Sequence, residues 1–147
     1  IKKVIMKLPK IITGDSFTDK RGTIFFNNSF DASDIKRIYI IKNSNTNTIR
    51  GWQGHKVEQR WFSALQGEFD INLIEIDNWE APSKDLKSIK YNLNSDVMNV
   101  LHVPSGFVSS IISKEPDSKL LVMSNYVIDE INDEYRYDID YFKLTDK

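Results

Sequence analysis

The thirteen residues from Arg50 to Phe62 form the segment with the most side chains that could do chemistry. They include two glycines, two tryptophans, one histidine and four other ionisable groups, just before a strongly apolar stretch. His55 has an ordinary pKa near neutrality, so it can take up and return a proton at working pH. A surface hairpin with a solvated histidine would account for a lone His, but the clustering favours the mouth of a ligand-binding barrel.

The neighbours of His55 are expected to point away from it. On a regular strand, successive side chains alternate between the two faces. Lys56 follows His55 directly and Glu58 lies three residues on, so both are expected on the opposite face. Glu58 and Arg60 are expected to form a cross-strand ion pair.

A second segment with possible chemistry runs from His102 to Ser109. Its Pro104-Ser-Gly106 core predicts a turn between two strands. Alone this is a common β-turn pattern, and we expect His102 to be structural.

The rest of the chain predicts strands that would position these segments. Ile and Val together number 27 and Ala only three, a mix that favours β structure over helix. Residues 15–22 and 43–48 are predicted as loops, and 66–67 as a hairpin turn. The predicted strands are 10–13, 23–26, 35–41, 58–65, 68–76, 88–93, 99–103, 109–113 and 119–127. Short strands at this spacing are typical of an all-β barrel or jelly roll.

Composition excludes several classes of protein. The 147 residues contain no Cys, which excludes disulfides and thiolate-bound metals. The net charge of −1 argues against a nucleic-acid or anionic-membrane surface. No apolar run approaches the roughly 20 residues that span a bilayer. We expect one domain over residues 1–147.

Together, the two segments resemble the paired motifs of the cupin superfamily, which implies an all-β cupin jelly-roll barrel. The spacing is kept, but the metal-ligand positions hold Gln53, His55, Arg60 and Ser109. An arginine cannot ligate a cation, and one imidazole binds a divalent metal weakly. The resemblance therefore implies a metal-free cupin without a cofactor, in which Arg60 points inward.

Within the cupins, the chain resembles the sugar 3,4-ketoisomerases, metal-free enzymes that act on thymidine-diphosphate-linked 4-keto-6-deoxyglucose. It is also similar to the related RmlC-like 3,5-epimerases, through Pro104-Ser-Gly-Phe107. The matching segments are Asp19-Lys-Arg-Gly22, Ile35-Lys-Arg-Ile-Tyr39, Arg50-Gly-Trp-Gln-Gly-His-Lys56, Ser124-Asn-Tyr126 and Asp133-Glu-Tyr-Arg-Tyr-Asp138.

The ketoisomerase resemblance implies roles for individual residues. His55 would be the general acid/base, assisted by Gln53 and Tyr39. The implied nucleotide- and substrate-binding residues are Arg50, Arg37, Arg21, Lys56, Arg60 and Trp52. Each arginine could instead form a surface salt bridge, and Trp52 could instead belong to the core.

The same resemblance implies a cytoplasmic homodimer in which strands of residues 1–30 are exchanged between subunits. The expected reaction converts a nucleotide-linked 4-keto-6-deoxyhexose to its 3-keto isomer, for surface-polysaccharide synthesis. Because Gln53 stands where the family has its first histidine, two alternatives stay open. One is 3- or 3,5-epimerisation, and the other is sugar binding without catalysis.

Overall fold

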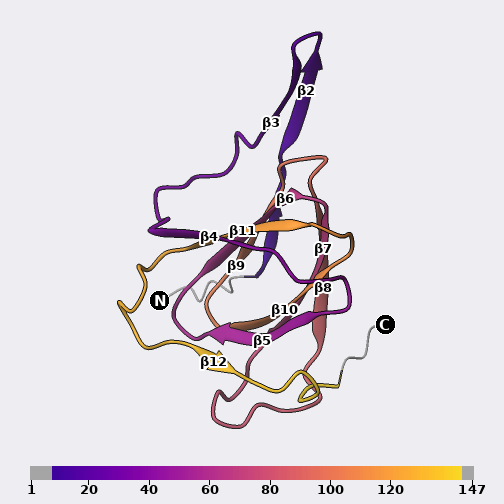
Figure 1. Cartoon of the computed structure of the whole chain (residues 1–147). Coiled ribbons are helices and arrows are strands. Elements are labelled where there is room, and N and C mark those ends of the chain that lie inside the picture. The colour runs from indigo at the N-terminus through magenta and orange to yellow at the C-terminus, as the bar shows by residue number, and fades with distance from the viewer. Residues whose placement is uncertain (1–7, 144–147) are drawn as a thin grey trace.

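The computed structural model describes residues 8–143 (Figure 1), and within that range the chain is entirely strand, turn and loop. Its twelve strands are β1 (Lys10–Ile12), β2 (Asp15–Asp19), β3 (Gly22–Phe26), β4 (Arg37–Ile41), β5 (Ile49–His55), β6 (Arg60–Gln66), β7 (Glu68–Glu75), β8 (Ser88–Asn94), β9 (Val100–Val103), β10 (Phe107–Ser113), β11 (Lys119–Ser124) and β12 (Tyr135–Arg136). Among the described residues, no helix is long and apolar enough to cross a bilayer.

Two five-stranded antiparallel sheets make up the body of the molecule. One has the order β1-β9-β6-β11-β4 and the other the order β12-β5-β10-β7-β8. Except for β7 and β8, the neighbouring strands of these sheets are not consecutive in the sequence, as in a jelly roll. The expected all-β jelly-roll fold is thus confirmed. β2 and β3 form a separate hairpin that projects away from both sheets (Figure 1).

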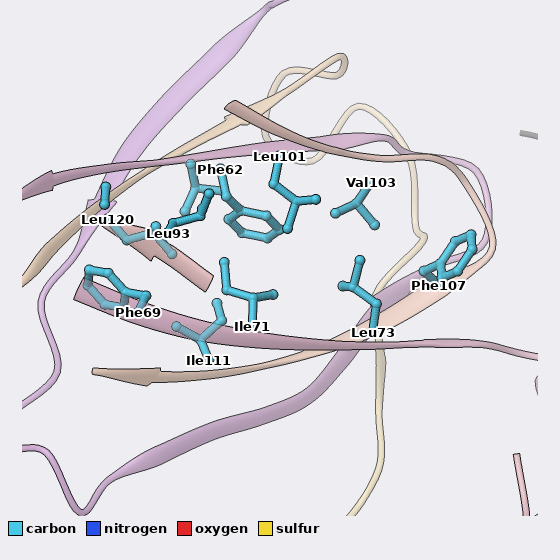
Figure 2. Close-up of a cluster of buried hydrophobic side chains, with 12 residues drawn as sticks. Phe62, Phe69, Ile71, Leu73, Leu93, Leu101, Val103, Phe107, Ile111 and Leu120 are labelled. Carbon is cyan, nitrogen blue, oxygen red and sulfur yellow. The ribbon is translucent and has the colours of Figure 1, made fainter. Parts of the chain in front are cut away.

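The main core lies between the two sheets (Figure 2). Phe69, Ile71 and Leu73 occupy alternate positions of β7, so all three point to one face. They pack in one cluster with Phe62 of β6 and Leu101 of β9. These apolar side chains fill the space between the sheets beside the polar residues described below.

A second cluster covers the outer face of the β5-containing sheet. Trp52, Ile74 and Val108 are buried there beneath Phe142 of the C-terminal segment. Trp52 is only 1% exposed, and its indole Nε1 donates a hydrogen bond to the carbonyl of Ile139, at 3.2 Å. The C-terminal segment is held along the edge of the sheet by the pairing of β12 with β5.

The predicted hairpin turn at residues 66–67 is wrong, because β6 and β7 belong to different sheets and do not pair. Three strands lie where none was predicted, and the shortest of them is β12. Residues 15–19, predicted as loop, form β2 and pair with β3 from Asp15–Phe26 to Asp19–Gly22. β2 is mostly polar, so its sequence shows no alternation of apolar and polar residues. Residues 49–55, for which no strand was predicted, form β5 in the interior of a sheet. Its glycines and mixed polarity hide the alternation of apolar and polar residues that is typical of a strand. Pairing with β10 and β12 makes the segment a strand nevertheless.

The segment expected to be exchanged between subunits, residues 1–30, is described from residue 8 onward; residues 1–7 lie outside the described range. The hairpin within it leaves Phe17 57% and Ile24 60% exposed. The outer face of β4 is also apolar, with Ile38 65% exposed. β4 therefore alternates along its length, with its aliphatic face turned to the outside.

Candidate active site

A pocket opens between the sheets, and part of its wall belongs to the main core. Its volume is ≈80 Å³, and its polar lining comes from Tyr39, Arg50, Gln53, His55, Arg60 and Ser109. A second recess of ≈260 Å³ reaches His55 and Arg60 from the side of Arg37 and of residues 127–134. His55 and Arg60 thus lie between two openings.

A bulge in β5 brings Arg50 into the pocket. Gln53 pairs with Ser109 of β10, but Arg50 pairs with Ile111. Three residue steps along β5 therefore match two along β10, which is a β-bulge. Arg50 and Gln53 consequently line the same pocket despite their odd spacing. Gly51 permits this close pairing, since an added Cβ would lie 2.7 Å from the Cβ of Ser110.

His55 ends β5 with its ring buried, 8% exposed. Its Nδ1 lies 3.0 Å from the backbone carbonyl oxygen of Asp133. A carbonyl can only accept, so Nδ1 carries the hydrogen and Nε2 is the nitrogen with a free lone pair. Burial lowers the pKa of His55 and the nearby Arg60 cation lowers it further, while Glu58 and Asp133 act in the opposite direction. The net effect favours the neutral imidazole, which is the form that accepts a proton.

Asp133 anchors the turn that follows His55. Its carboxylate accepts backbone hydrogen bonds from Lys56, Val57 and Glu58 at 2.9, 2.8 and 2.7 Å. Those three amides point at one carboxylate, so the chain turns instead of continuing as a strand. This is why β6 begins at Arg60 and not at residue 58 as predicted.

The turn also places Glu58 beside His55. Glu58 Oε2 lies 3.5 Å from His55 Nδ1, and both side chains are nearly buried. The expectation that Glu58 faces away from His55 is therefore wrong, because it assumed a regular strand. The ion pair of Glu58 with Arg60 is present at 3.2 Å, but within one segment and not across strands.

Arg60 connects Glu58 to Tyr39. Its Nη2 donates to Glu58 Oε1, and its Nη1 donates to Tyr39 Oη at 3.0 Å. Ser124 Oγ donates a further hydrogen bond to Glu58, at 2.8 Å. The guanidinium is buried and points inward, as expected from the cupin spacing.

Three side chains have the ligand types of a metal site. One ligand atom each from His55, Glu58 and Asp133 lies within 4.8 Å of the others. However, both oxygens of Asp133 already accept amides, and Arg60 neutralises Glu58. A cation there would have to displace these bonds and would sit beside a guanidinium, so the donor set fits a metal poorly.

Comparison with known protein families identifies the family of this chain. A family model described as FdtA, WxcM-like, C-terminal, matches residues 2–147. The chain belongs to the FdtA family. No curated protein matches it.

Solved structures of similar fold include both kinds of relative that the sequence resembles. The QdtA 3,4-ketoisomerase of Thermoanaerobacterium thermosaccharolyticum, solved as a variant with TDP-4-keto-6-deoxyglucose, shares 22% identity over 93% of each chain, with a TM-score of 0.69. The WlaRB TDP-quinovose 3,4-ketoisomerase of Campylobacter jejuni shares 22% identity over 92% of this chain and 98% of its own, with a TM-score of 0.67. The RmlC epimerase of Mycobacterium tuberculosis shares 12% identity over 92% and 71%, with a TM-score of 0.70. At these identities, the likeness establishes the fold.

The pocket of this FdtA-family chain brings together five of the residues given a catalytic or binding role from the sequence, and Ser109 of the cupin motif lies with them. The five are His55, Gln53, Tyr39, Arg50 and Arg60. Gln53 Nε2 also donates a hydrogen bond to Glu134 Oε1, at 2.7 Å. Arg37 lines the second recess, with its guanidinium 4.6 Å from the centre of the Tyr39 ring.

Three other residues named from the sequence lie elsewhere. Trp52 is packed on the outer face of the sheet, so the expectation that it contacts a ligand is not met. Lys56 has an exposed side chain beyond the pocket rim, and its backbone is tied to Asp133. Arg21 lies at the hairpin turn, paired with Asp19 at 2.6 Å.

The sequence assigned no site role to Asp133 or Glu134, and to Glu58 only an ion pair with Arg60. Asp133 and Glu134 belong to the tail segment that resembles the ketoisomerases, which was the available signal. Their contacts reach 77 and 81 residues back to Lys56 and Gln53, so local spacing could not reveal them.

Proposed function

We propose that this protein is a metal-independent isomerase that converts a nucleotide-diphosphate-linked 4-keto-6-deoxyhexose into its 3-keto isomer. The observation that carries the proposal is His55: a buried imidazole on the pocket wall, held through Nδ1, with a pKa that favours the neutral base. Family membership and the substrates of QdtA and WlaRB support a TDP-sugar as substrate.

The proposed reaction moves one C–H proton and exchanges the positions of a carbonyl and a hydroxyl. His55 Nε2 removes the proton from C3, and the electron pair forms the C3=C4 double bond. Tyr39 donates its phenolic proton to O4, which yields an enediol. Tyr39 then takes the proton from O3 as the C3 carbonyl forms, and the His55 imidazolium returns its proton to C4. Atoms and charges balance, and both groups end as they began.

Tyr39 is well placed for the proton transfers at O4 and O3. Its oxygen already accepts a hydrogen bond from Arg60, so its own proton is free to point to another acceptor. A positioned general acid or base contributes roughly 10²–10⁴-fold to a rate.

The diphosphate would be held by arginines at the pocket mouth. Arg50 and Arg37 line the two openings, and guanidinium forks pair well with phosphate oxygens. We propose a homodimer in which the projecting hairpin packs on a second copy. The exposed Phe17 and Ile24 side chains support such a partner, and Arg21 at the hairpin turn would then reach the other subunit.

One observation favours a second candidate function. Gln53 cannot take a proton, and its amide is already engaged by Glu134. A pocket with a single base would also suit a cupin that binds a nucleotide sugar without converting it, or one that epimerises the carbon beside the ketone.

The discriminating experiment incubates the purified protein with TDP-4-keto-6-deoxyglucose and follows the sugar by NMR. We expect the 3-keto isomer from the wild type and none from His55→Asn, which keeps a hydrogen-bonding side chain but no base. His102→Asn, a change at the other histidine of the chain, is the matched control and should remain active. Binding without any product in the wild type would favour the binding role, and inversion at C3 or C5 would favour the epimerase.

A further inference from the structure

Arg60 is an unusual side chain to find on the inner wall of a sugar pocket. Its side chain is only 9% exposed, and its two terminal nitrogens are taken by Glu58 and Tyr39. Its Nε is buried and makes no hydrogen bond. The guanidinium is enclosed and already bonded to Glu58 and Tyr39, which argues against phosphate binding as the main role of Arg60.

Charged and titratable groups surround His55 from every side. Glu58 and Arg60 approach it from the turn and β6, and Asp133 and Glu134 approach from the C-terminal segment. Arg37 and Tyr39 of β4 and Arg50 of β5 line the same openings. Asp133 is also buried close to His55, but its carboxylate accepts three backbone amides. Glu58 and Arg60 are the buried ion pair beside His55.

We infer that Glu58 and Arg60 are a positioning pair, in which Arg60 offsets the Glu58 carboxylate beside His55, so that the buried ring stays neutral, and turns the phenolic proton of Tyr39 toward the pocket. The inference deepens the proposed function and rests on it for its catalytic consequence, although the charge balance can be measured without any substrate. In this arrangement one buried ion pair touches both the base and the acid of a pocket that lacks a second histidine.

The two members of the pair act on His55 with opposite sign. The Glu58 carboxylate favours the imidazolium, whereas the Arg60 cation disfavours it. If Arg60 is removed, Glu58 is left as an uncompensated buried anion 3.5 Å from the ring, and the imidazolium gains stability. If Glu58 is neutralised, the Arg60 cation remains and the imidazolium loses stability.

The experiment is an NMR titration of the histidine rings in the full chain. There are two histidines, so two ring signals are followed, and a His102→Gln variant assigns them. His102 serves as the internal reference, because it stacks on Trp61 at 4.9 Å, in a different cluster from the pocket. The variants are Arg60→Met, Glu58→Gln and the double variant.

We expect Arg60→Met to raise the titration midpoint of His55 by about one pH unit, and Glu58→Gln to lower it. The double variant should return toward the wild type, because it removes both charges. Unchanged midpoints in both single variants, or shifts in the same direction, would overturn the inference. Arg60→Lys keeps the charge, so its midpoint should stay near that of the wild type; a shift as large as that of Arg60→Met would also overturn it. This lysine variant keeps the test decisive if Arg60→Met does not fold.

Activity gives a second readout. The acid limb of the kcat/KM profile should move with the NMR midpoint in each variant, with a larger change in kcat than in KM. A wild type that binds TDP-sugar but forms no product would refute the proposed function and leave the titration result standing. An acid limb that stays fixed while the midpoint moves would refute the catalytic part of the inference.

Discussion

Replacing Asp133 with alanine should destabilise the protein by disconnecting the turn after His55. The Asp133 carboxylate accepts three backbone N–H groups, from Lys56, Val57 and Glu58, at 2.7–2.9 Å. Asp133 is itself buried, with 4% exposure. Asp133→Ala therefore removes three charge-assisted hydrogen bonds at once and leaves their donors without an acceptor.

The size of the effect follows from those bonds. A hydrogen bond to a charged group contributes roughly 1.5–3 kcal/mol, so three give an upper bound of about 4.5–9 kcal/mol. The turn can relax and admit water to the freed amides, which brings the expected loss to about 3 kcal/mol. For a chain of this size, that corresponds to a fall in Tm of about 6–12 °C.

The assay combines thermal unfolding with amide hydrogen exchange. Asp140→Ala, a change at an exposed aspartate of the same C-terminal segment, is the control and should leave Tm within about 1 °C. The amides of Lys56, Val57 and Glu58 should exchange faster in Asp133→Ala, while the strands of the main core keep their protection. An unchanged Tm, or protection of the three amides equal to that of the wild type, would refute the reasoning.

Three further predictions concern the core, pH and assembly. Trp52→Ala should cost about 3–5 kcal/mol of stability, measured by urea unfolding, because its buried ring packs with Val108 and Phe142. The pKa of His55 is lowered in the folded protein, so the unfolded chain protonates first. Stability should therefore fall as pH drops below about 6.5, and less so in His55→Gln. Phe17→Ser with Ile24→Ser should shift the mass in light scattering from a dimer toward 17.1 kDa.

The sequence predicted the fold class well because its strongest strands alternate clearly. β7 shows this best, since Phe69, Ile71 and Leu73 are spaced two residues apart on one face and are all fully buried. β5 was missed because two glycines and a bulge break its period. In that case the fold is decided by partners from distant parts of the chain, which local pattern does not report.

The site was predicted in part. The resemblance to cupin motifs was sufficient to expect Gln53, His55 and Arg60 around one pocket, and the structure brings them together. Glu58 was expected on the wrong face because the turn that reverses it depends on Asp133, 75 residues away. Trp52 was included with the ligand residues because an aromatic ring can stack on a ligand. The C-terminal segment that buries it lies far along the chain, so the sequence around Trp52 does not report that contact.

We propose that His55, as the base of the pocket, moves a C–H proton beside a ketone. Incubation of the wild type with TDP-4-keto-6-deoxyglucose in deuterated water detects this proton transfer. We expect the 3-keto product to form with solvent deuterium at C4, and the recovered substrate to carry deuterium at C3. His55→Asn should show neither. Wild-type protein that binds the substrate yet yields no product and no deuterium above a protein-free blank would show that His55 does not move this proton.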